Sequence, residues 1–395
     1  MATQTSELVR APACTVAEAK ITLCHFTVTQ RRLKSRSFYM ECMPLAARGI
    51  RIRYVAPART PERHNGVDFI PLRWRSNRIL RFLSTPSLLA QLLRQNAGLY
   101  HFQDPELLPL AFLLKWIFHK RIVYDVYEDF PSMALTKAWI PRLLRPIAAK
   151  AVAGAEHLAA RCFDGVITAD PFTLRRLARN RASRKLVFYN FPNLDFFPPP
   201  MDAPKNFDIV YRGGLSERAG TYLLLDVMRK LEAEGKSTTL LLIGYGDNDL
   251  AERNLRAQIR RLGLESSVTI RPRLEHQEMA TAFSQARIGV SPLQAIPKFL
   301  LNIPVKIFEY WACGLPVIAS NLAPIRPFFH SAKAGLLFPP GNSAELARCI
   351  RWMLDHPESA AKMGQHGRAA IIERFNNCSE GRKLHRFCTQ IVRAS

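Results

Sequence analysis

Residues 302–320 read NIPVKIFEYWACGLPVIAS, a helix-length segment followed directly by a short β-rich run. Asn302 and Pro304 favour the start of a helix, and Gly314 is a typical stop. The run PVIAS has the length and the residue types of a buried strand. This order predicts one helix–strand unit of a parallel α/β sheet.

The same alternation of short apolar runs and amphipathic, helix-length segments extends along the chain, as is typical of parallel sheets. In the second half we expect strands at 207–212, 238–244, 267–271, 286–291, 316–320 and 335–338. In the first half we expect a helix at 38–49 and strands at 21–27, 52–57, 98–102, 121–126, 164–168 and 186–190.

A proline-dense stretch, FPNLDFFPPPMDAPKN (191–206), separates the two alternating halves. A chain of 395 residues is too long for one ordinary core. We therefore expect an α/β protein with two doubly wound, Rossmann-like domains facing a central cleft, with ligands at the carboxyl ends of the strands. The expected parts are a disordered extension (1–19), a first domain (20–195), a linker (196–206), a second domain (207–376) and a C-terminal helix that packs back on the first domain (377–395).

Composition narrows the class of protein. The formal net charge is +24, which indicates either a solvated basic surface or a partner with phosphates, such as nucleic acid or an anionic membrane. The eight cysteines form no CxxC pair and no zinc spacing, so we expect reduced thiols in a cytosolic protein. We recognise no secretory signal in residues 1–19. The most apolar segment, at 107–118, is too short to span a membrane.

Two segments combine a strand, a glycine turn and a helix start. In FDIVYRGGLSERAG (207–220), Gly213 and Gly214 permit close approach to a phosphate, and Arg218 adds a cation; a tight turn without a ligand is the alternative. In LLIGYGDNDLAER (241–253), Gly244 and Gly246 lack the third glycine and the downstream acid of a dinucleotide fingerprint. The pair Asp247 and Asp249 is better explained as helix capping than as metal binding, so we expect no metal.

Lys306 and Glu309 give the sharpest signal. Glu309 is the only acidic residue between Glu278 and Glu345, and it is an i,i+3 neighbour of Lys306 near the start of the expected helix. One interpretation is a local ion pair that favours the helix dipole. The other is a site in which Lys306 and the helix N-terminus hold a diphosphate while Glu309 accepts hydrogen bonds from a ribose diol.

The second half resembles the donor-binding domain of retaining glycosyltransferases of family 4, which have the GT-B fold. The resemblance rests on VYRGGLSERAGTYLLLDVM, LLIGYGD, PVKIFEYWACGLPVIAS and AGLLFPPGN. The first half is similar to the polysaccharide and cell-wall type of that family through YHFQDPELLPLAFLLK, VYDVYEDFP, FDGVITAD and FYNFPNLDFF. The resemblance covers roughly residues 20–390.

The resemblance implies a metal-independent hexosyltransferase, without a cofactor, that moves a sugar from a nucleotide diphosphate sugar to a saccharide or lipid-linked acceptor. Such an enzyme would serve exopolysaccharide, lipopolysaccharide or cell-wall glycan synthesis. A front-side mechanism is implied, in which the leaving diphosphate helps to deprotonate the acceptor. The alternatives are a GT-B-fold sugar-nucleotide epimerase and a basic nucleic-acid-binding protein, although no helix-turn-helix, zinc finger or RNP motif accompanies the charge.

The chain departs from the family at the donor site. In the family's Glu-x7-Glu pair, Glu309 matches the second, ribose-binding member, but the first position is Leu301. The sugar contacts would then pass to backbone amides near Ile303. In place of the family's Arg/Lys pair we expect Arg218 and Lys306. The full set of expected donor residues is Gly213, Gly214, Arg218, Gly244, Gly246, Arg273, Ile303, Val305, Lys306 and Glu309.

In the first half, His101 falls where the family places a histidine close to the transferred sugar, so with Lys306 and Glu309 it is an expected catalytic residue. A satisfied core histidine is the alternative. Asp104, Glu128 and Asp129 follow strands and are expected either to bind acceptor hydroxyls or to cap helices.

The basic segments 31–36 and 73–82 are expected to seat this half on an anionic membrane, although ordinary solvated loops would look the same. The expected location is cytoplasmic, peripheral at the inner face of the plasma membrane, without nucleic acid as a partner. The expected membrane-facing residues are Arg31, Arg32, Lys34, Arg73, Arg75 and Arg78.

Overall fold

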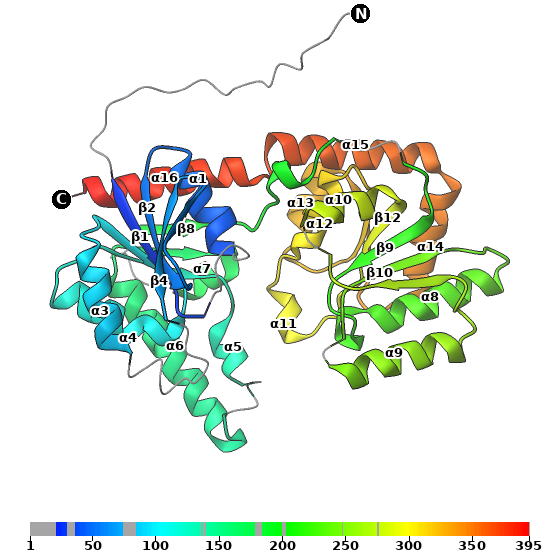
Figure 1. Cartoon of the computed structure of the whole chain (residues 1–395). Helices are drawn as coiled ribbons and strands as arrows, with labels where there is room; N and C mark the ends of the chain where they lie inside the picture. The colour runs from blue at the N-terminus through cyan, green and yellow to red at the C-terminus, as the bar shows by residue number, and fades with distance from the viewer. Residues whose placement is uncertain are drawn as a thin grey trace, which may run out of the picture.

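The computed structural model describes residues 21–29, 36–73, 84–135, 137, 140–177, 184–199, 203–246, 248–274 and 276–394. Among these residues, the strands form two sheets, one in each half of the chain. Figure 1 shows the two halves side by side, each with helices packed on its sheet.

The N-terminal sheet has the strand order β3-β4-β2-β1-β5-β6-β7-β8. All its neighbouring strands are parallel except the hairpin of β3 and β4. The order reverses between β1 and β5, which is the kind of switch point where open α/β sheets bind ligands. The strands are β1 (Thr22–Phe26), β2 (Arg51–Pro57), β3 (Glu62–His64), β4 (Val67–Leu72), β5 (Leu99–Phe102), β6 (Ile122–Val126), β7 (Gly165–Thr168) and β8 (Arg184–Val187).

The C-terminal sheet has the order β11-β10-β9-β12-β13-β14 with all pairs parallel. Its switch point lies between β9 and β12. The strands are β9 (Phe207–Arg212), β10 (Leu240–Ile243), β11 (Val268–Arg271), β12 (Ala286–Ser291), β13 (Val317–Ser320) and β14 (Gly335–Phe338).

Helices cover both faces of each sheet. In the C-terminal domain, one face packs on α8 (Thr221–Ala233), α9 (Asp249–Arg261) and α14 (Ser343–Asp355). The other packs on α10 (His276–Ser284), α12 (Val305–Ala312), α13 (Arg326–Ala332) and α15 (Pro357–Glu373). Apolar side chains on both faces of parallel strands explain their continuous hydrophobic runs.

In the N-terminal domain, one sheet face packs on α3 (Thr85–Arg94), α4 (Leu108–Trp116), α6 (Arg145–Cys162) and α7 (Pro171–Leu177). The other is covered by the π-helical segment η2 (Ser37–Cys42), α1 (Met43–Ala46) and α16 (Asn377–Arg393). The short helix α5 (Phe130–Ala134) follows β6, and α11 (Pro297–Leu300) precedes α12.

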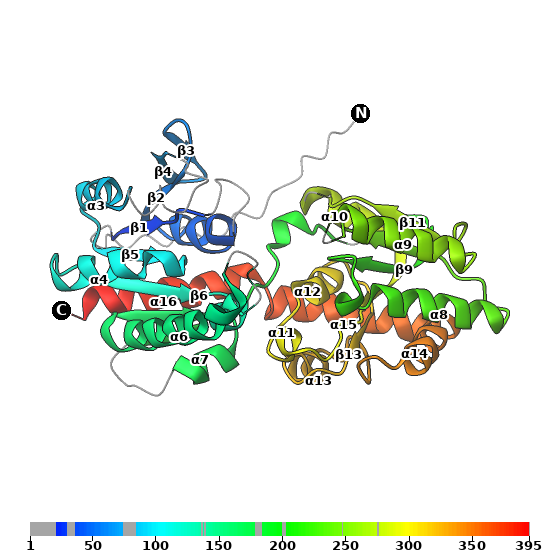
Figure 2. The ribbon, with the colours of Figure 1, turned by 90° about the horizontal axis from the view of Figure 1, so that it is seen from below.

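The last helix belongs to the first domain by packing. α16 contributes Leu384, Phe387, Cys388 and Ile391 to the core cluster of the N-terminal sheet. Gly165 on β7 makes this approach possible, because a Cβ there would lie 2.7 Å from side-chain atoms of Phe387 and Ile391. Figure 2 shows α15 and α16 running one after the other across both domains.

The sequence pattern missed three local features. The hairpin of β3 and β4 lies in a segment with no strand expected. The helix expected at 38–49 is a π-helical turn followed by only four α-helical residues, with Pro44 in the first turn of α1. The strand expected at 186–190 is β8, at 184–187.

The proline-dense segment is not a bare connector. Phe191 and Phe197 are buried in the C-terminal core, and the ring of Phe191 packs 4.8 Å from Phe308 and 5.3 Å from Phe375. The backbone N–H of Asn377 donates to the carbonyl of Pro192, 3.0 Å away. The two crossings between the domains are therefore hydrogen-bonded to each other.

Replacing Phe191 by alanine should destabilise the C-terminal domain by about 3–5 kcal/mol, because it empties a ring-sized space in a buried aromatic cluster. Denaturant unfolding followed by tryptophan fluorescence measures this. Ile372→Ala is the control, since Ile372 is 53% exposed on α15. An equal effect of both substitutions would contradict burial of Phe191.

Candidate functional site

The site begins where β9 and β10 end in two glycine turns. Gly244 has a φ of 154°, and a Cβ there would lie 1.8 Å from the carbonyl oxygen of Gly213, so only glycine fits. The two turns thus touch through their backbones. They open into a pocket of about 270 Å³ lined by Arg212, Gly213, Gly214, Ile243, Gly244, Tyr245, Arg273 and Met279.

Arg212 is held at the pocket by α12. Its backbone N–H donates to the hydroxyl of Tyr310 at 2.7 Å, and its guanidinium lies 3.3 Å from Oε2 of Glu309. Glu309 is only 3% exposed, and its Oε2 has no hydrogen-bond partner among the described residues. The carboxylate therefore neutralises a cation at the pocket wall and keeps an oxygen lone pair unused.

Lys306 lies behind the first glycine turn. Its Nζ is 4.1 Å from the ring centroid of Tyr211 and 2.8 Å from the place that a Cβ of Gly213 would occupy. Burial, and to a smaller extent the charge of Arg212, lower the pKa of Lys306 to about 7 against the opposing effect of Glu309. The lysine thus gains or loses its charge near neutral pH.

The structure brings together part of the expected donor set. Gly213, Gly214, Gly244 and Arg273 line the pocket. Lys306 and Glu309 adjoin it through Gly213 and Arg212. The local Lys306–Glu309 ion pair, one of the two interpretations, is not found among the described residues; Glu309 pairs with Arg212.

The remaining expected donor residues do not line the pocket in the described part of the chain. Arg218 is an exposed residue of the 3-10 turn η6 (Glu217–Ala219). Gly246 lies in the turn before α9, where a Cβ would meet the backbone nitrogen of Glu252 at 2.9 Å. Ile303 and Val305 are half-buried at the start of α12.

Sequence reasoning missed Arg212, Tyr211 and Tyr310. Arg212 could have been found from its position in the sequence, because it is the last residue of β9 and directly precedes Gly213. The capping interpretation also needs correction: Asn248 is the N-cap of α9, accepting from the N–H of Ala251. Asp249 lies in the first turn of α9, and Asp247 is outside the described residues.

On the N-terminal side, Asp104 is buried and its two carboxylate oxygens accept from Thr27, from the N–H of Val28 and from Thr29. It therefore ties down the loop after β1. Asp129 caps α5 by accepting from the N–H of Ser132, the helix-capping alternative, and Glu128 is exposed.

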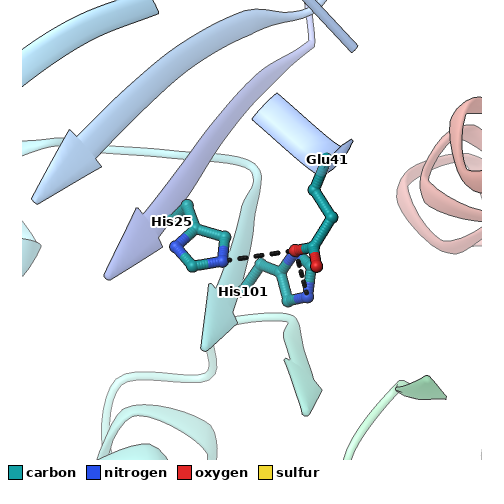
Figure 3. Close-up of side chains that lie close together, drawn as sticks. All are labelled: His25, Glu41 and His101. Carbon is teal, nitrogen blue, oxygen red and sulfur yellow. Dashed lines mark ion pairs between the residues drawn. The ribbon is translucent and has the colours of Figure 1, made fainter. Parts of the chain in front are cut away.

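His101 has no exposed surface. It belongs to a buried polar cluster with His25 and Glu41, drawn in Figure 3. Gln103, two residues after His101, donates to both Glu41 and Asp125 at 2.8 Å. The expected sugar contact of His101 would have to reach an imidazole inside the core.

Of the expected membrane-facing residues, Arg73 is exposed after β4. Arg31, Arg32, Lys34, Arg75 and Arg78 lie outside the described residues.

Residues 206–356 match the family model of glycosyl transferases group 1. The chain is 27% identical over 171 residues to the amylovoran biosynthesis glycosyltransferase AmsK of Erwinia amylovora, which covers 43% of this chain and 41% of that protein. The chain spans less than half the length of several curated relatives that it matches.

Two solved structures share the fold over nearly the whole chain. Sucrose-phosphate synthase from Thermosynechococcus elongatus superposes with a TM-score of 0.75 at 20% identity, covering 95% of this chain and all of that one. Alr3699/HepE of Anabaena, in complex with UDP, has a TM-score of 0.70 at 18% identity, covering 94% and 100%. The expected GT-B fold and the resemblance to glycosyltransferases are confirmed.

Lys306 should give the protein a distinct pH dependence of stability. Its pKa is about 7 when folded and ordinarily about 10.4 when unfolded, so the unfolded state binds more protons between these values. The contribution of Lys306 to the free energy of unfolding therefore rises with pH in that window, by up to about 1.4 kcal/mol per unit. Urea unfolding of the protein and of Lys306→Met from pH 7 to 10 measures it. Identical slopes would contradict the shifted pKa.

Proposed function

We propose that the chain transfers a sugar from a nucleotide diphosphate sugar to a saccharide or lipid-linked acceptor, since residues 206–356 match the family model of glycosyl transferases group 1. The observation that carries the proposal is the pocket at the ends of β9 and β10, walled by two glycine turns and by Arg212 beside a buried glutamate.

The pocket suits a nucleoside diphosphate. Backbone atoms of Gly213 and Gly244 permit close approach to phosphate, and Arg212 and Arg273 supply positive charge at the wall. Lys306 adds a further cation behind Gly213 when protonated. Oε2 of Glu309, which lies 3.3 Å from the Arg212 guanidinium but makes no hydrogen bond among the described residues, is an acceptor suited to a ribose hydroxyl. UDP bound in the Anabaena relative is in keeping with this ligand class.

The reaction we propose proceeds with retention. The bond between the anomeric carbon and the diphosphate breaks on the face where the acceptor oxygen bonds, and the acceptor proton passes to a diphosphate oxygen. The protein then needs to position the two substrates and to stabilise negative charge on the leaving group. Arg212, Arg273 and Lys306 are the groups proposed for that task, without a metal or another cofactor at the donor.

Glu309→Gln should weaken binding of the matching nucleoside diphosphate at least about 10-fold, because the amide neither neutralises Arg212 nor accepts as strongly from ribose. Calorimetry with UDP, GDP and ADP measures this, and sugar transfer from the matching donor completes the test. Glu358→Gln, an exposed substitution on α15, is the control. Failure of all three nucleotides to bind the unmodified protein would refute the donor site.

We also propose that the N-terminal domain rests on an anionic membrane surface through the 3-10 turn η4 (Arg142–Leu144) and the start of α6. Leu143 is 90% exposed, and Leu144 and Ile147 are exposed beside it. Arg142 and Lys150 are exposed on the same segment, and no acidic residue occurs between Asp129 and Glu156. Figure 1 shows α6 extending away from its sheet.

Exposed leucines among basic residues suit the boundary between lipid headgroups and acyl chains. Each basic residue near an anionic surface contributes about 1 kcal/mol. In the described part of the chain, no helix is both long and apolar enough to cross a membrane. Such seating would give the protein access to a lipid-linked acceptor.

Leu143→Ser combined with Ile147→Ser should lower binding to phosphatidylglycerol-containing vesicles several-fold, because two exposed apolar anchors are lost. Vesicle co-sedimentation at moderate salt measures it. Leu250→Ser with Ile372→Ser is the matched control, since both residues are similarly exposed in the C-terminal domain. Equal binding by both double variants would exclude this membrane face and leave the donor proposal intact.

A further inference from the structure

The cluster of His25, Glu41 and His101 has no part in the proposed sugar transfer. His25 on β1 and His101 on β5 are register partners at the switch point of the N-terminal sheet, and Glu41 comes from η2 above them. Figure 3 shows both imidazoles facing the carboxylate. Nε2 of His25 lies 3.4 Å, and Nε2 of His101 3.7 Å, from the same oxygen, Oε2 of Glu41.

The hydrogen bonds around the cluster leave these three atoms unused. Oε1 of Glu41 accepts from Gln103 at 2.8 Å and from Arg36, whereas Oε2 has no hydrogen-bond partner. The ring nitrogens of His25 and His101 also have none among the described residues. Since buried polar groups are nearly always bonded, three unsatisfied groups that face one another indicate an absent partner.

The charges around the cluster favour a cation. Arg36 is the cation that pairs with both Glu41 and Asp125, so two carboxylates face one guanidinium. The unbonded atoms, imidazole nitrogens and a carboxylate oxygen, are also of the types that ligate a transition-metal ion.

We propose that His25, Glu41 and His101 bind a divalent transition-metal ion, with zinc as the preferred ion. Two imidazole nitrogens and one carboxylate oxygen form a ligand set typical of zinc. Bonds of about 2.0–2.2 Å in a tetrahedron place ligand atoms about 3.4 Å apart, close to the two measured separations. Gln103 and Arg36 orient the carboxylate from outside, as groups around a metal site do.

This metal would join three elements rather than serve the donor. It would fix η2 to the ends of β1 and β5 in the N-terminal domain, whereas the nucleotide pocket lies at the ends of β9 and β10. A metal ion at this cluster would therefore not contradict metal-independent sugar transfer at the donor site. His101 becomes a ligand and a positioning residue instead of a sugar contact.

The test uses the full chain. The protein is stripped with a chelator, dialysed and titrated with Zn²⁺ and Co²⁺; bound metal is quantified by mass spectrometry, and Co²⁺ geometry is read from visible absorption. We expect one equivalent of zinc per chain, tetrahedral cobalt bands and a raised thermal midpoint. His25→Gln and Glu41→Gln should each weaken zinc binding at least 10-fold. The readouts do not depend on sugar transfer.

His157→Gln is the matched control, because both ring nitrogens of His157 already contact backbone carbonyls on α6 and at Arg176. It should bind zinc like the unmodified protein. Binding of well under one equivalent by the stripped protein overturns the proposal, as does unchanged affinity in folded His25→Gln. Should the variants not fold, the zinc stoichiometry and cobalt spectrum of the unmodified protein decide the question.

Discussion

The C-terminal site depends on the contacts that α12 makes with the end of β9. Tyr310 accepts the backbone N–H of Arg212, and Glu309 pairs with its guanidinium. The helix itself is held by burial, since every residue from Lys306 to Ala312 is buried. These contacts hold the end of β9, its glycine turn and the start of α12 together around the proposed diphosphate site. Burial of α12 in the apolar core therefore positions the charged pair of Arg212 and Glu309 at the pocket.

The two domains have similar sheet topologies, but the regions around their switch points differ: one is open and the other is filled. Next to the C-terminal switch point, glycines after β9 and β10 replace side chains and leave a pocket beside the strand ends. At the N-terminal switch point, two histidines, a glutamate and their polar neighbours fill the equivalent place. The same fold therefore offers a ligand site in one domain and a buried polar cluster in the other. Side-chain size at a few strand ends decides between them.

Most strands and the change of domain could be predicted from the sequence, because hydrophobic runs and glycine stops are local signals. Lys306, Glu309 and Gly213 were identifiable for the same reason. The partner of Glu309 was not, since Arg212 lies 97 residues away and meets it only through the parallel pairing of strands. The convergence of His25, Glu41 and His101 is equally non-local. The hairpin of β3 and β4 lacked a long apolar run, because all three residues of its edge strand β3 are polar.

The position of α16 affects how the protein is made. One face of the N-terminal sheet is covered only in part, by η2 and α1, until residues 377–393 supply Leu384, Phe387 and Ile391. Domains ordinarily fold as they leave the ribosome, the N-terminal one first. Here the first domain to be synthesised is the last to be completed, because Gly165 on β7 receives Phe387 and Ile391 only after the entire second domain has been synthesised. Nascent chains of this protein therefore pass through a stage in which that face needs protection from aggregation.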